Sequence, residues 1–113
     1  MSRKTFSELV IELAKQIPPG KVVTYGGLSR AAGGGNLAAR SITGILAKSS
    51  EWRSIPFHRI VYANGQVWFS PEYEAKRKKL YKKEGIKLNE KGRIENFGEV
   101  LMTEEDWEKV RRA

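Results

Sequence analysis

Three consecutive glycines, Gly33-Gly34-Gly35, separate two short segments that both have the apolar spacing of amphipathic helices. Residues 25–32 precede the glycines and residues 37–49 follow them, and Thr24 and Asn36 stand where helix N-caps are favoured. Because glycine adopts the backbone conformations that close a helix, we expect the connection to be a tight turn. Two short helices joined in this way are typical of a helix-turn-helix, so the pattern predicts a DNA-binding motif.

The second of these segments has a face made of small side chains around one cation. Arg40, Thr43, Gly44 and Ala47 recur at helical spacing. Gly44 is informative, because a glycine inside a helix costs about 0.5–1 kcal/mol relative to alanine. One interpretation is an ordinary solvated face in which Gly44 merely weakens the helix. The other is that the face packs closely against protein or DNA, and this interpretation explains the glycine better. Since bulky side chains for reading the major groove are missing, the face favours an approach to the minor groove.

The rest of the pattern predicts a mainly α-helical chain with a small β element. Further helices are expected at residues 6–17, where Thr5 and Glu8 form a capping box, from residue 71 or 72 to Gly85, and after Thr103. A strand is expected at residues 55–63, a turn at 64–65, a return strand or loop at 66–69, and a small hairpin at 94–101.

These elements define one helix-turn-helix domain of winged-helix type. We expect residues 1–88 to form the DNA-binding unit and residues 89–113 to be an extension packed on it or appended to it. With 113 residues, the chain is too short for a second domain of ordinary size.

The charge distribution indicates a polyanionic partner. The formal net charge is +8, and residues 1–70 carry nine basic and three acidic side chains against twelve and ten in residues 71–113. The dense lysine run at residues 76–83 is flanked by Glu74 and Glu84 and is interpreted as a solvated helix face. No signal peptide or membrane-spanning run is present, so we expect a cytoplasmic monomer that associates with the nucleoid when it binds DNA.

The absence of cysteine excludes several kinds of chemistry. A chain with no cysteine has no disulfide, no thiolate metal site and no thiol nucleophile. Its one histidine would leave a zinc site to be built mainly from carboxylates, which catalytic zinc rarely uses. We therefore expect no metal and no cofactor.

Charged side chains interrupt an apolar run at residues 54–61. His58 and Arg59 stand inside this run, and a buried cation needs a partner. Glu84 is the candidate, because a carboxylate in the last turn of a helix is disfavoured by the helix dipole unless it has a specific partner. On spacing alone, these residues are interpreted as an internal ion pair with a core histidine and a core Phe57.

Five motifs together resemble the C-terminal domain of O6-alkylguanine-DNA alkyltransferases. They stand in the same order and spacing, at residues 20–25, 38–40, 55–61, 64–65 and 84–86. In that family a Pro-Cys-His-Arg motif supplies the cysteine that takes the alkyl group from a flipped-out guanine. This sequence has Phe57 at the position of that cysteine, and a phenyl ring can neither attack an alkyl carbon nor hold the group. The alkyl transfer reaction is therefore excluded.

What remains resembles the alkyltransferase-like proteins, which keep the fold and the lesion pocket without the cysteine. The resemblance implies a non-enzymatic DNA damage sensor that flips O6-alkylguanine out of duplex DNA and flags it for nucleotide excision repair. Its partners would be double-stranded DNA containing alkylated guanine and nucleotide excision repair proteins. Those relatives usually carry tryptophan or alanine at the cysteine position, so Phe57 is a departure that still supplies a flat apolar wall.

The resemblance also assigns roles to individual residues on the DNA side. Tyr25 corresponds to the tyrosine that presses on the phosphate 3′ of the target and helps to rotate the nucleotide out. Arg40 corresponds to the finger that enters from the minor groove and fills the vacated position. The neighbouring residues expected at this interface are Thr24, Ala39, Ser41 and Gly44.

On the pocket side, Phe57 would line the floor beneath the extruded base. Trp68, Phe69 and Ser70 correspond to the lid, where the two aromatic rings either stack on the base or belong to the core. His58, Arg59 and Glu84 correspond to the hydrogen-bonded network behind the reactive position, which has only a structural task here.

Two other functions remain open on the sequence. A winged-helix DNA-binding regulator without lesion specificity is favoured if Trp68 and Phe69 are buried in the core and no cavity lies beside Phe57. A hydrolytic or glycosylase-type enzyme would have to use His58 and Glu84 as its acid–base pair.

Overall fold

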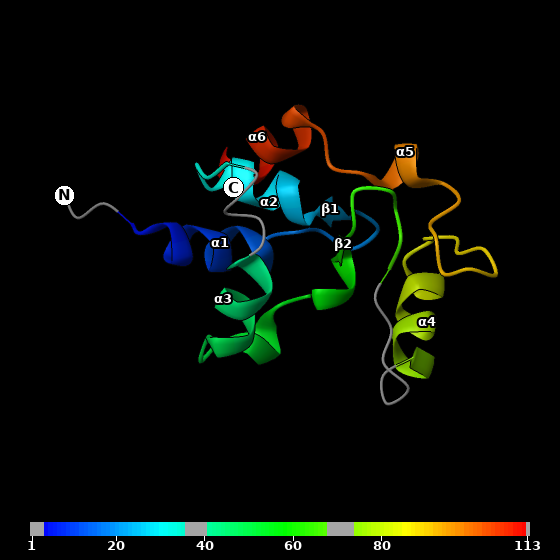
Figure 1. The fold of residues 1–113 in the computed structure, drawn as a ribbon. Coiled ribbons are helices and arrows are strands. Elements are labelled where there is room, and N and C mark those ends of the chain that lie inside the picture. Colours follow the sequence, from blue (N-terminus) through cyan, green and yellow to red (C-terminus); the bar gives the residue numbers. More distant parts are fainter. Residues whose placement is uncertain (1–3, 36–40, 68–73, 113) are drawn as a thin grey trace.

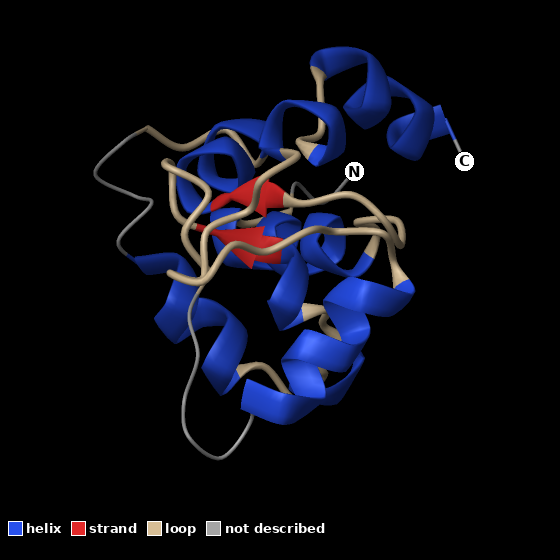
Figure 2. Cartoon of the chain, turned by 90° about the vertical axis from the view of Figure 1, so that its right-hand side faces the viewer, coloured by secondary structure: helices blue, strands red, loops and turns tan. Residues whose placement is uncertain are grey.

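The computed structural model describes residues 4–35, 41–67 and 74–112, and it is mostly helical around one short parallel strand pair (Figure 1). The elements in chain order are α1 (Phe6–Lys15), β1 (Val23–Thr24), α2 (Tyr25–Ala31), α3 (Ile42–Lys48), the 3₁₀ turns η2 (Trp52–Ser54) and η3 (Phe57–Arg59), β2 (Ile60–Val61), α4 (Glu74–Lys83), α5 (Phe97–Val100) and α6 (Glu104–Arg112). Figure 2 shows the two strands side by side in the middle of the molecule, with helices around them.

The helix at the start of the chain forms as the sequence predicts. Thr5 caps α1 by accepting a hydrogen bond from the backbone N–H of Glu8 at 3.2 Å. The Glu8 carboxylate accepts from the Thr5 hydroxyl at 3.1 Å rather than reaching back to its N–H, so the capping box is only half formed. The apolar side of α1 packs on α2 and α3.

Helices α2 and α3 confirm the predicted helix-turn-helix class. Thr24 caps α2 through a 2.9 Å hydrogen bond from the backbone N–H of Gly27, and Gly33 follows the helix with a φ of +90°. Helix α3 is described from Ile42 onward, so the predicted Asn36 cap lies outside the described residues.

The predicted strand at residues 55–63 is wrong over most of its length. Only Ile60–Val61 are extended, and residues 57–59 form η3. Pro56 has no N–H to donate to a strand ladder, and the turn after it lets His58 and Arg59 reach the carboxylate of Glu84, which directly follows α4. Strand β2 pairs with β1 in parallel register, Val23 with Ile60 and Thr24 with Val61.

The hairpin predicted at residues 94–101 is also wrong. Leu88 and Ile94 form an isolated antiparallel bridge, residues 97–100 form the short helix α5, and Leu101 lies in a parallel bridge with Val22. Hydrogen bonds from Val22 N–H to Val100 and from Met102 N–H to Val22 hold this segment beside β1. The apolar spacing of the segment fits a strand, but the tertiary contact with β1 decides its conformation.

The core consists of two clusters. The first contains apolar side chains of α1, α2 and α3 together with Met102 and Trp107, and the second contains Tyr81 of α4 with Val61, Val100 and nearby residues. Residues after 88 thus contribute to both clusters. The predicted helix after Thr103 is present as α6, capped by mutual hydrogen bonds between Thr103 and Asp106. Among the described helices, none is long and apolar enough to cross a membrane.

Candidate nucleic-acid interface

Tyr25 lies where β1 passes into α2, and contacts from two other elements fix its ring. Its side chain lies near the Thr43 side chain on α3, and its ring centroid lies 5.5 Å from that of Tyr62, at an interplanar angle of 46°. Burial raises the pKa of Tyr25 above its ordinary value of 10.0, and the nearby Tyr62 adds to this effect. Tyr25 is therefore a neutral hydrogen-bond donor at physiological pH, which suits a contact with a phosphate oxygen.

The small-residue face of α3 is open to solvent. Thr43, Gly44 and Ala47 are exposed, and a Cβ added at Gly44 would meet no atom within 4 Å. Ser41 and Gly44 line a shallow cavity of about 490 Å³ between α3 and Ser7 and Ile11 of α1. The described residues do not supply a packing partner for Gly44, so an ordinary solvated face and close packing against an external partner such as DNA both stay predictions.

Replacing Gly44 with alanine is expected to separate stability from binding. The new methyl group meets no clash and favours the helix, so the free energy of unfolding should rise by about 0.5–1 kcal/mol in a urea titration. The same methyl group should hold the helix away from DNA and lower duplex affinity.

Gly98→Ala in α5 is the matched control, because a Cβ there also meets open space but lies on a different helix. It should leave duplex affinity unchanged. If Gly44→Ala binds DNA as tightly as the unmodified protein, the α3 face makes no close approach to the duplex.

The predicted network is formed around Glu84, whose side chain is only 6% exposed. Glu84 Oε1 accepts from Arg59 Nε at 2.9 Å and from the Gly20 backbone N–H at 3.0 Å, and Oε2 accepts from Arg59 Nη2 at 3.0 Å and faces His58 Nε2 at 2.6 Å. Arg59 Nη1 also donates to the carbonyl of Ile17, and the Tyr81 hydroxyl donates to the carbonyl of His58. The network therefore ties η3 to the segment that follows α1 and to the C-terminal end of α4.

The electrostatics of this network make it a poor acid–base pair. Burial alone would raise the pKa of Glu84, but hydrogen bonds from Arg59, Gly20 and His58 outweigh it and lower the pKa to about 2. Burial lowers the pKa of His58 below 6.5 despite the opposing carboxylate. At neutral pH the ring is neutral and donates its Nε2 proton to Glu84. A general base needs a pKa near the working pH and a free oxygen, so the geometry disfavours the glycosylase-type enzyme.

These pKa values predict acid sensitivity. Below pH 6.5 the unfolded chain takes up the His58 proton before the folded one does, and below pH 4.5 the same holds for Glu84. Stability should therefore fall as the pH is lowered, and Glu84 alone should account for up to about 3 kcal/mol between pH 4.5 and pH 2. Urea titrations at pH 7, 5 and 3 measure this loss.

In Glu84→Gln the part of this pH dependence below pH 4.5 should disappear. Equal pH slopes in the two proteins would contradict the role given to Glu84.

A cavity of about 280 Å³ lies beside Phe57, between the η2–η3 segment and α4. Its lining contains Trp52, Ile55, Phe57, His58, Lys76, Arg77 and Leu80. The walls are aromatic and aliphatic and the rim carries two cations, while the network of Glu84 lies behind His58. A winged-helix regulator without lesion specificity was favoured if no cavity lay beside Phe57. This cavity shows that this condition is not met.

Several predicted site residues lie outside the described residues. Arg40 and Ala39 precede α3, and Trp68, Phe69 and Ser70 precede α4. Their roles stay predictions. Of the described members, Thr24 and Tyr25 lie at the start of α2, and Ser41 and Gly44 lie at the start of α3 beside a cavity shared with α1. Phe57 lies at the cavity just described.

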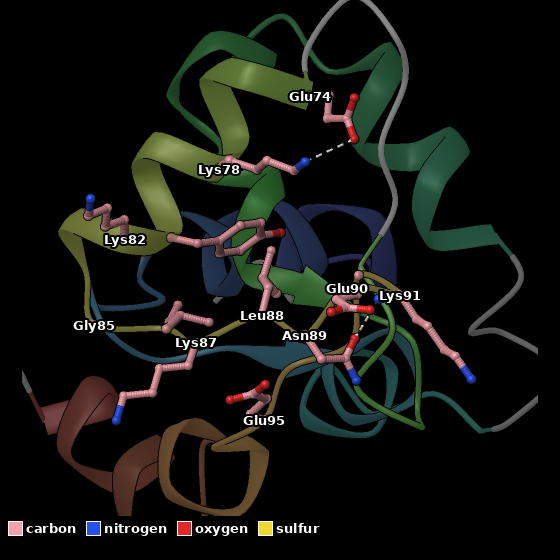
Figure 3. Close-up of a pocket in the computed structure, with 13 residues that line it drawn as sticks. Glu74, Lys78, Lys82, Gly85, Lys87, Leu88, Asn89, Glu90, Lys91 and Glu95 are labelled. Carbon is pink, nitrogen blue, oxygen red and sulfur yellow. Dashed lines mark hydrogen bonds and ion pairs between the residues drawn. The ribbon is translucent and has the colours of Figure 1, made fainter.

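A larger cavity, of about 860 Å³, lies away from these residues, between α4 and residues 85–95 (Figure 3). Lysines and glutamates alternate around it, and Lys78 reaches to Glu74 across one turn of α4. It contains none of the predicted site residues, so its size does not indicate the functional site.

Sequence reasoning missed three residues that the structure adds to the site. Tyr62 lies against Tyr25, and Trp52 and Arg77 line the cavity beside Phe57. Arg77 stands in a lysine-rich run, and Trp52 in a segment without periodicity, so neither gave a signal. The pairing of Tyr25 with Tyr62 follows from the parallel register of β1 and β2, which the predicted strand and turn at residues 55–65 did not suggest.

Comparison with known proteins identifies the family of this chain. The family model of the 6-O-methylguanine DNA methyltransferase, DNA binding domain, matches residues 5–86. A DNA base-flipping protein of Escherichia coli (strain K12) is 32% identical over 92 residues, which cover 80% of this chain and 70% of that protein. The crystal structure of S. pombe Atl1 in complex with damaged DNA containing O6-carboxymethylguanine has the same fold, with a TM-score of 0.70 and 24% identity over 91% of this chain and 99% of that one. The chain therefore belongs to the family of the 6-O-methylguanine DNA methyltransferase DNA-binding domain.

This membership confirms the resemblance drawn from the five motifs. A relative that keeps an enzymatic name, a bifunctional methyltransferase/endonuclease of Thermoplasma volcanium, is 35% identical over 94 residues, which are 81% of this chain but 29% of that longer protein. The present chain has no cysteine to accept an alkyl group.

Proposed function

We propose that this protein is a non-enzymatic sensor of alkylated guanine in duplex DNA. The α2–α3 unit would dock in the minor groove, and an O6-alkylguanine would rotate into the cavity beside Phe57 without being repaired there. The observation that carries the proposal is the cavity itself. It lies at the position of the missing cysteine, with the supporting network of Glu84 intact behind it.

The chemistry of the cavity suits an extruded base. Phe57 and Trp52 offer aromatic faces, and base–aromatic stacking is worth about 1–3 kcal/mol per base. Arg77 at the rim carries donors of the kind that pair with guanine O6 and N7. An alkylated guanine pairs poorly with cytosine, so its extrusion costs less than that of a normal base, and selectivity can arise without catalysis.

Tyr25 and Arg40 would have separate roles in contacting the duplex. Tyr25 would press its hydroxyl on the phosphate 3′ of the target, and Arg40 would fill the space left in the stack. Thr24, Ala39, Ser41 and Gly44 would form the close surface around them. Trp68, Phe69 and Ser70 would cover the extruded base from the lid side.

The bound complex would serve as a flag for nucleotide excision repair. A protein without an acceptor group cannot release the lesion in repaired form, so its useful product is a stable, recognisable complex. In this proposal residues 1–88 hold the DNA, and residues 89–113 are packed on the same domain as the extension.

An equilibrium titration tests lesion selectivity. Two duplexes that differ only in one O6-methylguanine in place of guanine are bound at the same salt concentration, because affinity for DNA depends steeply on salt. The proposal predicts tighter binding of the lesion duplex. Equal affinities would contradict it and favour a winged-helix DNA-binding protein without lesion specificity.

A further inference from the structure

Tyr25 and Tyr62 are neighbours because of the register of the strand pair. Thr24 of β1 stands opposite Val61 of β2, and the next residue along each parallel strand is a tyrosine. The two rings therefore meet at the carboxyl ends of the strands, with centroids 5.5 Å apart and planes tilted by 46°. This separation lies within the range of favourable aromatic pairs.

Tyr62 is unusual among the large apolar side chains of the described chain. Most of them are buried or half-buried, whereas Tyr62 is 45% exposed, and only Trp52 is exposed to a similar extent. The hydrophobic effect should draw such a ring into the core. Isolated exposed aromatic side chains are common, but Tyr62 lies against Tyr25, the tyrosine proposed to act on the phosphate. Tyr62 also directly follows β2, and β2 directly follows η3, which contains Phe57.

We propose that Tyr62 is a positioning residue for base extrusion, which braces the ring of Tyr25 against the DNA backbone. The inference rests on the proposed flipping function. A tyrosine that pushes on a phosphate must keep its ring from turning aside. Among the described residues, Tyr25 packs against the first core cluster and lies near Thr43 of α3. Tyr62 supplies the opposing contact, so Tyr25 is held between α3 and the end of β2.

The proposal separates extrusion from binding. Tyr62 carries no charge, so it adds little to the electrostatic attraction that dominates affinity for undamaged DNA. Its loss should weaken the step in which the nucleotide leaves the stack. Because the contact is made through the ring, phenylalanine should replace it and an aliphatic side chain should not.

The experiment compares Tyr62→Ala, Tyr62→Leu and Tyr62→Phe with the unmodified protein, after thermal melts have confirmed that each is folded. A fluorescent cytosine analogue is placed opposite O6-methylguanine, so that its emission rises when its partner leaves the helix. Fluorescence anisotropy of a lesion-free duplex measures binding separately. Tyr62→Ala and Tyr62→Leu are expected to lose at least half of the emission change at saturation and to bind the lesion-free duplex within twofold of the unmodified protein. Tyr62→Phe is expected to retain the full change.

Full emission change in Tyr62→Ala and Tyr62→Leu would overturn the proposal, and so would an equal loss in Tyr62→Phe, which would assign the effect to the hydroxyl. An emission change that is lost only in proportion to duplex affinity would also overturn it. If the unmodified protein gives no emission change, the flipping function itself fails, which is a separate result from failure of the role of Tyr62.

Discussion

Glu84→Gln is expected to lower the free energy of unfolding by about 3–5 kcal/mol, the usual cost of removing one partner of a buried ion pair. The glutamine keeps the shape of the side chain but loses the charge that balances Arg59, whose side chain is 16% exposed. It also places an NH₂ group against either Arg59 or His58, both of which donate to the carboxylate. Urea unfolding at pH 7 measures the loss.

Glu74→Gln is the matched control for this change. Glu74 pairs with Lys78 one helical turn away, but the two side chains are 49% and 58% exposed. Surface pairs of this kind contribute about 0.3–0.5 kcal/mol, so the control should unfold nearly as the unmodified protein does. Similar losses in the two variants would mean that the network of Glu84 does not hold η3 and α4 together.

The second large effect is expected at the DNA interface. Arg40→Ala should weaken binding of a duplex with O6-methylguanine by about tenfold or more, equivalent to at least about 1.4 kcal/mol, because nothing then fills the space of the extruded base. Binding of an undamaged duplex should fall much less, since it loses one cationic contact with the backbone. Competition titrations at fixed salt give the ratio of the two affinities for each protein.

Lys79→Ala is the control, because Lys79 is an exposed cation of α4, a different helix from α2 and α3. It should weaken both duplexes in the same proportion and reduce the salt dependence slightly. If Arg40→Ala also weakens both duplexes in the same proportion, Arg40 is a general phosphate contact and not an intercalating finger.

The sequence predicted the local elements better than the long-range ones. Thr5, Thr24 and Thr103 cap helices where the pattern placed them, because capping depends on residues three positions apart. The strand at residues 55–63 and the hairpin at 94–101 were wrong. Their conformations depend on pairing with β1 and on the carboxylate of Glu84, which lie far away in the sequence.

The site was predictable to a similar degree. His58, Arg59 and Glu84 form the predicted network, because a charge inside an apolar run requires a partner. The neighbours of Tyr25 were not predictable, since the Tyr62 contact depends on the parallel register of β1 and β2 and the approach of Thr43 on the tertiary placement of α3. A single sequence contains no signal for either.

Base extrusion without chemistry is the central claim, and one spectroscopic measurement tests it most directly. A fluorescent cytosine analogue opposite O6-methylguanine reports whether its partner leaves the stack when saturating protein is added, and recovery of the intact lesion afterwards reports whether any bond was broken. The account predicts increased emission with the lesion duplex, no increase with the corresponding guanine duplex, and full recovery of O6-methylguanine. Unchanged emission at saturation, or loss of the alkyl group or of the base, would contradict it.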